Sequence, residues 1–267
     1  AVKFSDELYE FISYHCILNS SKLAEERGSY KTYEGSLWKQ DTLPIDTYKS
    51  LMAYLDQKPI IHRGKKFCPE VDWKKVRHHI SEHGMRNSNT MAIAPTATIS
   101  YIQGCSPCIE PDFSMYFVYE NKSGNLSVVN EWFVKRCKEK GLWKPELIEA
   151  LKAVDGDVSS LNLPPDMQLL FKTAFDQDQF KLIDAAAARQ KWIDMGQSLN
   201  LFNKETSLKY LNDLYIHARN RGLKSTYYLR NKSASTIEKS ASPATPDDSE
   251  ATPKACSVID PTCESCQ

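Results

Sequence analysis

Residues 86–100 read Arg-Asn-Ser-Asn-Thr-Met-Ala-Ile-Ala-Pro-Thr-Ala-Thr-Ile-Ser, and this stretch decides the fold class because it breaks an otherwise helical pattern. Thr90 to Ala94 is typical of a short buried strand, which Pro95 ends. The small and hydroxylated residues that follow are expected to begin a helix. Such a turn presents unpaired backbone N–H groups and hydroxyls together, which suits a bound phosphate. It suits ordinary helix capping equally well, so the motif alone leaves both interpretations open.

On both sides of this stretch, apolar residues recur at helical spacing. Leu8, Phe11 and Ile12 share one face of the first helix, and Gly28 is a natural stop. The predicted helices are residues 5–27, a short helix after Pro44, 72–83 closed by Gly84, 128–140, 146–154, 179–197, and 207–220 with Thr206 as cap. The predicted strands are residues 90–94, 113–119 and 223–229. The chain is therefore expected to be α/β and mostly helical by residue count.

The bulk composition is ordinary for a globular protein. Lys+Arg and Asp+Glu both total 34, so the formal net charge is zero. With no basic surplus and no apolar run long enough to span a bilayer, we expect neither a nucleic-acid nor a membrane partner. The N-terminus shows neither an initiator Met nor the apolar region of a signal peptide. The chain is therefore expected to be a piece of something longer or a processed product.

The chain contains 8 cysteines. A disulfide scaffold is normally shorter and richer in loops, so we expect a cytoplasmic protein whose cysteines are mostly reduced. Cys16 and Cys137 fall inside predicted amphipathic helices, where a small buried apolar side chain explains them.

The composition changes sharply after Arg230. Residues 231–262 contain almost no large apolar side chain, so they cannot bury enough surface to offset the entropy of ordering and should be disordered. We divide the chain accordingly into a folded part, 1–230, and a flexible arm, 231–267. A tether of about 32 residues has an r.m.s. span of roughly 30 Å.

Near its end this arm carries Cys263-Glu-Ser-Cys266, followed by Gln267. A dithiol on a mobile arm could enter a buried pocket, exchange with a disulfide there, and swing out to be reduced by an external thiol protein. The alternative is a zinc site, with Cys105 and Cys108 as the second ligand pair. Structural zinc sites more often draw their ligands from compact, nearby hairpins, which favours the redox interpretation. An incidental exposed pair is the third possibility.

Two adjacent tyrosines, Tyr227 and Tyr228, fall in the last predicted strand. Adjacent strand residues point to opposite faces, so the ordinary interpretation is one ring in the core and one outside. Paired tyrosines can also relay oxidation, but a relay needs the rings close together. The strand end would have to be twisted or bulged to permit that.

Taken in order, these features resemble the large, catalytic subunit of class I ribonucleotide reductases, and the resemblance covers essentially the whole chain. Its landmarks are Leu43-Pro-Ile-Asp-Thr-Tyr-Lys49, His83-Gly-Met-Arg-Asn-Ser88, Ala94-Pro-Thr-Ala-Thr98, Gly104 to Pro111, Ser225-Thr-Tyr-Tyr-Leu229 and the terminal cysteine pair. The fold implied is the C-terminal part of a ten-stranded α/β barrel.

The resemblance also implies a role for each matching residue. The substrate phosphates would bind to the loop of Pro95, Thr96, Ala97, Thr98 and Ile99. Tyr227 and Tyr228 would be the last relay of a radical travelling to a catalytic cysteine. Cys263 and Cys266 would reduce the active-site disulfide that each turnover leaves.

Several partners follow from the same resemblance. They are a small subunit whose metallocofactor generates the radical, a thioredoxin or glutaredoxin that recharges the arm, and a ribonucleoside diphosphate substrate. No cofactor is expected on this chain itself, and no metal is assigned to it.

The chain departs from the family pattern in one respect. The thiyl cysteine, its Asn and Glu neighbours, the two reducing cysteines and the allosteric sites have no match here, and Cys16 and Cys68 do not resemble the catalytic loop. We therefore expect the chain to be inactive without an N-terminal part. The alternatives are a zinc-stabilised interaction module and an inactive scaffold that binds the small subunit.

Overall fold

The computed structural model describes residues 1–231 except 61, 63–65, 122–123 and 205–206. The chain divides into two units, Ala1–Ser233 and Ala234–Gln267, and every described residue belongs to the first. The predicted arm, residues 231–267, lies outside the described residues except for Asn231; Cys263 and Cys266 are outside them, and the boundary at residue 230 stays a prediction.

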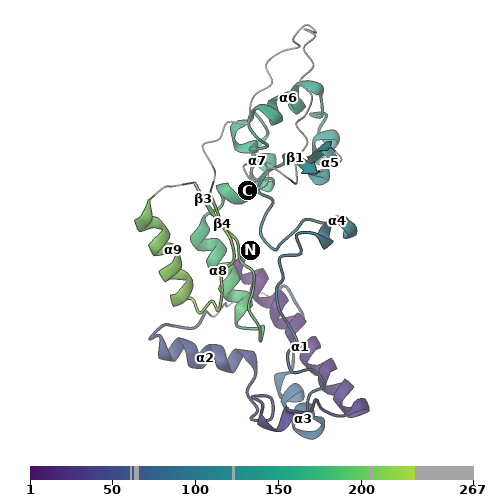
Figure 1. Ribbon diagram of the computed structural model, residues 1–267, viewed down its shortest axis with the longest axis vertical. Coiled ribbons are helices and arrows are strands. Elements are labelled where there is room, and N and C mark those ends of the chain that lie inside the picture. The colour runs from purple at the N-terminus through teal and green to yellow at the C-terminus, as the bar shows by residue number, and fades with distance from the viewer. Residues whose placement is uncertain (61, 63–65, 122–123, 205–206, 232–267) are drawn as a thin grey trace, which may run out of the picture. The chain divides into compact units, whose positions relative to one another are not determined.

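Helices are the main secondary structure of the described part and far outweigh the strands, as the sequence predicts (Figure 1). Gly28 and Gly84 end the first and third helices with φ of 76° and 75°, a conformation in which a side chain would be strained. The helices are α1 (Val2–Arg27), α2 (Pro44–Tyr54), α3 (Trp73–His83), α4 (Ile99–Gln103), α5 (Glu131–Glu139), α6 (Pro145–Ala153), α7 (Pro165–Leu170), α8 (Gln179–Gln190) and α9 (Leu208–Asn220). Short 3₁₀ turns are η1 (Tyr33–Gly35), η2 (Val158–Ser160) and η3 (Ala174–Asp176).

The strands form two small sheets. β1 (Tyr116–Asn121) and β2 (Gly124–Val129) make an antiparallel hairpin. β3 (Leu201–Asn203) and β4 (Leu229–Asn231) pair in parallel. Within the described ranges these two-stranded sheets do not close on themselves, so the ten-stranded barrel stays a prediction.

The predicted helix 179–197 is wrong at its C-terminal end, because α8 stops at Gln190. Residues beyond it pair with the chain near residue 91 instead of continuing the helix. The Asp194 carboxylate accepts the backbone N–H groups of Thr90 and Met91 at 2.6 and 2.9 Å, and the N–H of Met195 donates to the Met91 carbonyl at 3.1 Å. Partners a hundred residues away therefore overrule the local helical pattern.

The predicted strands are shifted or shortened. Residues 90–94 form a single parallel bridge, between Ile93 and Gln197. The predicted strand 113–119 begins at Tyr116, and the predicted strand 223–229 is replaced by β4, which begins at Leu229. The last helix is capped by Ser207, whose hydroxyl accepts the N–H of Tyr210, whereas Thr206 lies outside the described residues.

Three apolar clusters hold these elements. The first joins α1 and α3 through Ile17, Val76 and Ile80, and the third joins α8, β3 and α9. The second lies among α5, α6 and α7 and contains Cys137, which is fully buried as predicted. Burial raises the pKa of the Cys137 thiol to about 11, so this cysteine is protonated at neutral pH.

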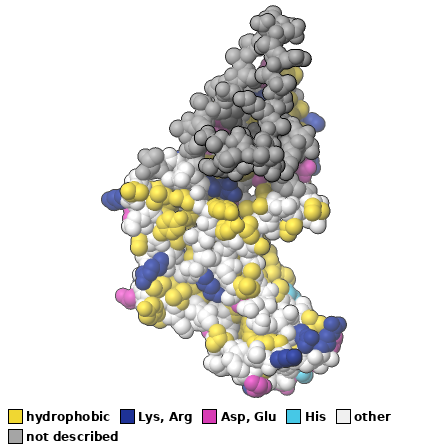
Figure 2. Space-filling model, in the orientation of Figure 1, with side chains coloured by type: hydrophobic (Ala, Val, Ile, Leu, Met, Phe, Trp, Pro, Cys, Tyr) yellow, Lys and Arg dark blue, Asp and Glu magenta, His cyan; other side chains and the backbone are white. Residues whose placement is uncertain are grey.

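Hydrophobic side chains also reach the surface on the face that Figure 2 depicts. On α9 the exposed ones are Leu208, Tyr215 and Ile216, with exposed fractions of 82%, 41% and 48%. No helix among the described residues is both long enough and apolar enough to cross a bilayer.

Candidate active site

Three parallel extended segments form the frame of the candidate site. The middle one, residues 195–203, pairs on one side with residues 91–93 and on the other with residues 227–231. Ile93 is level with Gln197, and Leu201 is level with Leu229. In this register Pro95, two residues after Ile93, and Tyr227, two residues before Leu229, are both level with residue 199. The frame therefore brings together two regions that lie about 130 positions apart in sequence.

The 95–99 loop turns through an unusual backbone conformation. Thr96 has φ 54°, in the left-handed region that a β-branched residue rarely adopts. Its hydroxyl donates to the Pro95 carbonyl at 2.8 Å and accepts the N–H of Cys108 at 3.2 Å, so it is occupied inside the loop. Ala97 and Thr98 are exposed, and none of the described residues accepts their backbone N–H groups. Ile99 is exposed as well and its N–H likewise has no acceptor among the described residues, so the exposed donors of this loop are those at residues 97, 98 and 99.

The 95–99 loop continues to residue 111, and the far end of this longer segment is fixed by a buried carboxylate. Glu110 is 6% exposed and accepts both the backbone N–H of Asn200 at 2.8 Å and its side-chain amide at 3.0 Å. Asn200 is 1% exposed and is level with Tyr228 in the register of β3 and β4. Residues 95–111 are therefore held to the middle segment at both ends, by the Ile93–Gln197 bridge just before them and by the Glu110–Asn200 hydrogen bonds.

The two tyrosines lie in contact with each other. The Tyr227 hydroxyl donates to the Tyr228 hydroxyl at 3.3 Å, and the ring centroids are 4.1 Å apart. Both precede β4, so strand alternation does not separate them; the N–H of Tyr227 donates to the Leu199 carbonyl, and the Tyr228 carbonyl accepts the N–H of Leu201. The two rings are 45% and 54% exposed. The hydrogen bond to Tyr228 raises the pKa of Tyr227, so it is a neutral phenol at physiological pH.

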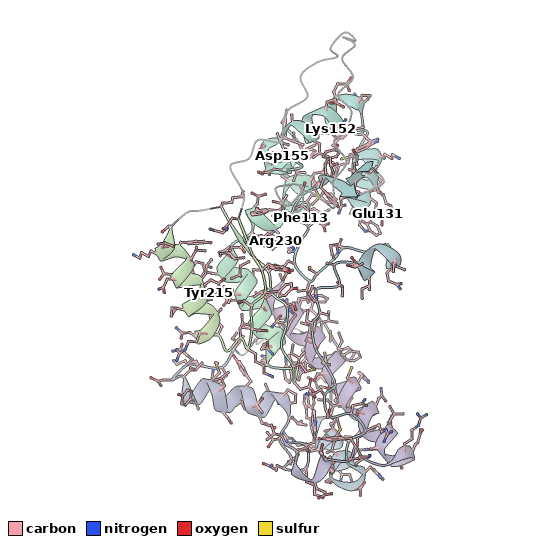
Figure 3. The ribbon with its side chains drawn as sticks, viewed as in Figure 1. Phe113, Glu131, Lys152, Asp155, Tyr215 and Arg230 are labelled. Carbon is pink, nitrogen blue, oxygen red and sulfur yellow. The ribbon has the colours of Figure 1, made fainter. Side chains whose placement is uncertain are left out.

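A cation and a thiol adjoin this pair. Arg230, which extends from β4 (Figure 3), lies over the Tyr228 ring at 5.5 Å from its centroid. Burial and the charge of Glu110 raise the pKa of the Cys108 thiol, although Asn200 and Arg230 partly oppose the shift. Cys108 is therefore a protonated thiol beside the pair. Cys105 is exposed, and both residues are free cysteines.

A cavity of about 560 Å³ lies elsewhere, between α1, α2, α3 and α8. It is lined by Asp6, Tyr48, Trp73, Lys191 and Trp192 among others, and by none of the predicted site residues. Its lining comes from α1, α2 and α3, from the segment between α2 and α3, and from the two residues that follow α8, whereas the predicted site is held by the three paired extended segments. We therefore treat the cavity as separate from the candidate active site.

The chain belongs to the ribonucleotide reductase family, because residues 1–229 match the model of that family's barrel domain. Similar proteins carry the corresponding names. The ribonucleoside-diphosphate reductase subunit alpha of Chlamydia pneumoniae is 44% identical over 90% of this chain and 23% of its own length. That of Helicobacter pylori is 38% identical over 88% of the chain and 26% of its length, and the large chain of Schizosaccharomyces pombe is 33% identical over 90% and 28%. The chain thus spans about a quarter of the length of these relatives.

Sequence reasoning did not assign three residues that build the site. Glu110 stands in a quoted landmark, Asp194 lies in a predicted helix, and Arg230 marks the end of the folded part, but none carried a role. The signal for Glu110 was its position between a cysteine loop and a proline. Asp194 acts through Thr90 and Met91, about a hundred positions away, which no local pattern reveals. Arg230, in contrast, lies over Tyr228, two positions before it.

Proposed function

We propose that this chain is the C-terminal part of the large subunit of a class I ribonucleotide reductase, completing a ten-stranded barrel in the cytoplasm. It works with an N-terminal part that carries the thiyl cysteine and with a small subunit whose metallocofactor supplies the radical. Together they reduce ribonucleoside diphosphates to deoxyribonucleotides. The exposed apolar residues of α9 support the proposal that another polypeptide packs against this part, since large apolar patches mark interaction surfaces.

One observation carries the proposal: the Tyr227 and Tyr228 hydroxyls lie at hydrogen-bond distance. Moving a hydrogen atom from one phenol to an oxidised neighbour breaks one O–H bond and forms another, so proton and electron counts balance. A direct hydrogen bond provides the path for both particles. Arg230 keeps positive charge beside the pair, which disfavours any step in which a ring holds a cation.

The 95–99 loop serves as the phosphate site in this proposal. Its support is the pair of exposed backbone N–H groups at Ala97 and Thr98, together with the start of α4 at Ile99. Backbone amides of this kind bind phosphate without a cationic side chain. The Thr96 hydroxyl shapes the loop, so the Thr98 hydroxyl is the one left for the ligand.

The relay is tested by removing one phenol at a time. In the complete enzyme with its small subunit, Tyr227→Phe and Tyr228→Phe should each abolish nucleoside diphosphate reduction, because phenylalanine has no O–H to oxidise. Tyr54→Phe, which changes an exposed tyrosine on α2 outside the proposed sites, is the control and should keep full turnover. Full turnover in either relay variant would contradict the assignment.

The arm is tested separately. Cys263→Ser should stop turnover with a thioredoxin or glutaredoxin system yet spare it with dithiothreitol, because a small dithiol reaches the active-site disulfide without the arm. The measurement is product formed per subunit under each reductant. Equal loss under both would refute the shuttle, and stoichiometric zinc held by Cys105, Cys108, Cys263 and Cys266 would favour an interaction module instead.

A further inference from the structure

Two histidines on α3 face a carboxylate on α1. His79 and His83 are one helical turn apart and therefore share a face. Their Nε2 atoms lie 3.5 and 3.9 Å from the two carboxylate oxygens of Glu25, and their ring centroids are 4.6 Å apart. One ligand atom from each residue falls within 4.8 Å of the other two. The α1–α3 core, built on Ile17, Val76 and Ile80, holds the two helices in this alignment.

A second observation concerns the other nitrogen of His79. Its Nδ1 lies 2.8 Å from the hydroxyl of Ser21, one turn before Glu25 on α1. Ser21 is fully buried, so its hydroxyl is fixed in place. When this oxygen accepts the Nδ1 proton, Nε2 keeps its lone pair and points toward Glu25. A hydrogen bond to the far nitrogen is the outer-shell support that metal-binding histidines usually have.

We propose that Glu25, His79 and His83 form a binding site for a divalent transition-metal ion, with Zn²⁺ as the best fit. Imidazole nitrogen and carboxylate oxygen are both zinc ligands, at 2.0–2.2 Å from the metal. In a tetrahedral site ligand atoms then lie about 3.4 Å apart. The ligand atoms here lie within 4.8 Å of one another, so the widest separation must close by at most about 1.4 Å. Glu25 is long and exposed, with 53% of its side chain accessible, and can supply that movement.

The ordinary alternative is a pair of surface ion pairs. His83 also lies 3.8 Å from Glu82, and protonated histidines would be attracted to both carboxylates. Such ion pairs do not require the Ser21 hydroxyl at His79 Nδ1, whereas a metal-binding histidine is oriented by a hydrogen bond of this kind. Three protein ligands leave a fourth position for water, and the ion would join the C-terminal turn of α1 to the last turns of α3.

The test is a metal titration of the full chain after chelator treatment. Zn²⁺ stoichiometry and affinity are compared for the parent, His79→Ala, His83→Ala and Ser21→Ala. The matched control is His78→Ala, because His78 is exposed on the same helix and pairs only with Glu82 at 3.5 Å among the described residues. Co²⁺ replaces Zn²⁺ in a second titration, because thiolate ligands give sulfur-to-cobalt charge transfer and this site contains none.

We expect His79→Ala and His83→Ala each to lose one zinc equivalent, and His78→Ala to match the parent. Ser21→Ala should weaken that equivalent by about 10–100-fold. The lost Co²⁺ equivalent should show nitrogen and oxygen ligands only. His83 is partly exposed, so its substitution tests the site even if the buried Ser21 variant fails to fold. Equal zinc stoichiometry and affinity in the parent and His83→Ala, or bound Co²⁺ with a thiolate spectrum alone, would overturn the proposal.

Discussion

Asp194 shows how much a single carboxylate contributes at the residue scale. Its two oxygens accept the backbone N–H groups of Thr90 and Met91 and the Thr90 hydroxyl. These bonds fix the segment that leads into the 95–99 loop. The loop therefore depends on a side chain about a hundred positions further along the chain.

Asp194→Ala should lower the free energy of unfolding by roughly 2–3 kcal/mol, because it removes charge-assisted hydrogen bonds and leaves two amides unpaired. Urea denaturation followed by tryptophan fluorescence measures the loss. Asp213→Ala, at an exposed position on α9, is the control and should change stability by less than about 0.5 kcal/mol. A loss for Asp194→Ala no larger than the control's would show that the contact is dispensable.

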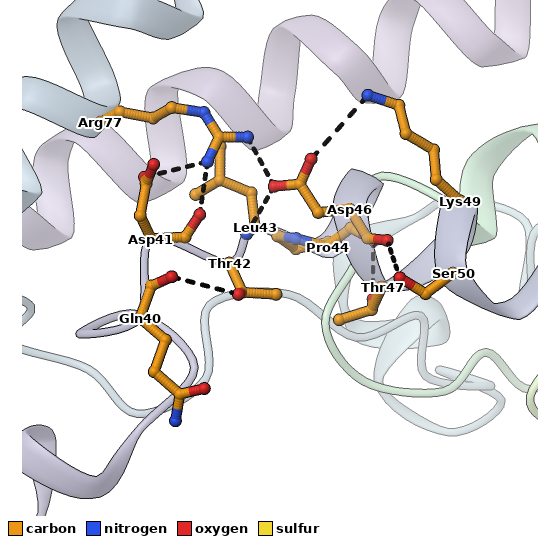
Figure 4. A network of polar contacts seen from close by, with 10 residues as sticks. All are labelled: Gln40, Asp41, Thr42, Leu43, Pro44, Asp46, Thr47, Lys49, Ser50 and Arg77. Atoms are coloured by element: carbon orange, nitrogen blue, oxygen red, sulfur yellow. Dashed lines mark hydrogen bonds and ion pairs between the residues drawn. The ribbon is translucent and has the colours of Figure 1, made fainter.

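At the element scale, the start of α2 is fixed by charge. Leu43 is its N-cap but has no side-chain acceptor, so Asp46 supplies the bond by accepting the N–H of Leu43 at 3.0 Å (Figure 4). Arg77 of α3 donates to Asp46 at 2.5 Å and to Asp41 at 2.9 Å. Partial burial alone would raise the pKa of the Asp46 carboxyl, but the Arg77 and Leu43 hydrogen bonds hold it below its usual value.

A lowered folded-state pKa means that Asp46 stabilises the protein above its unfolded pKa and loses this effect as pH falls through the folded value. Asp46→Asn should therefore lower stability by about 1 kcal/mol at pH 7, in the range of a lost helix cap. The difference should shrink on acidification below about pH 4, where the unfolded carboxyl begins to be protonated. Denaturation midpoints measured at several pH values check this, and a difference constant with pH would contradict it.

Elements with local causes were predictable from sequence, and those with distant causes were not. Gly28 and Gly84 end α1 and α3 as predicted, because a glycine stop is a local signal. The C-terminal end of α8 was mispredicted because the chain beyond Gln190 pairs with residue 91. For the same reason sequence reasoning left the tyrosine contact open: it depends on β4 beginning at Leu229. The metal candidate was missed because Glu25 lies 54 positions before His79.

At the scale of the whole described part, a buried polar cluster links α1 to the end of α8. Asp6 is 5% exposed. Its carboxylate accepts hydrogen bonds from the Lys191 ammonium at 2.8 Å and from the Trp192 indole N–H at 2.5 Å. Lys191 also donates to the Ile60 carbonyl. The Trp192 ring stacks on Trp73, with 5.7 Å between centroids. The cluster therefore joins α1, α3 and the end of α8.

Asp6→Ala should cost about 3–5 kcal/mol of unfolding free energy, because it strands the buried Lys191 ammonium. Asp6→Asn, which keeps an acceptor for Trp192 but loses the charge, should cost less. Unfolding in urea, followed by circular dichroism, ranks the two variants. An Asp6→Ala loss below about 1 kcal/mol would show that Lys191 finds another partner.

The pairing of residues 91–93 with residues 195–198 also affects folding during synthesis, because one segment is made well before the other. Met91 emerges from the ribosome 104 positions before Met195, its hydrogen-bonding partner. At about 5–20 residues per second, the earlier segment waits roughly 5–20 s for that partner. During this interval its backbone edge is open to pairing with other chains. Slowing translation between the two segments should therefore lower the yield of folded protein, even though no amino acid is changed.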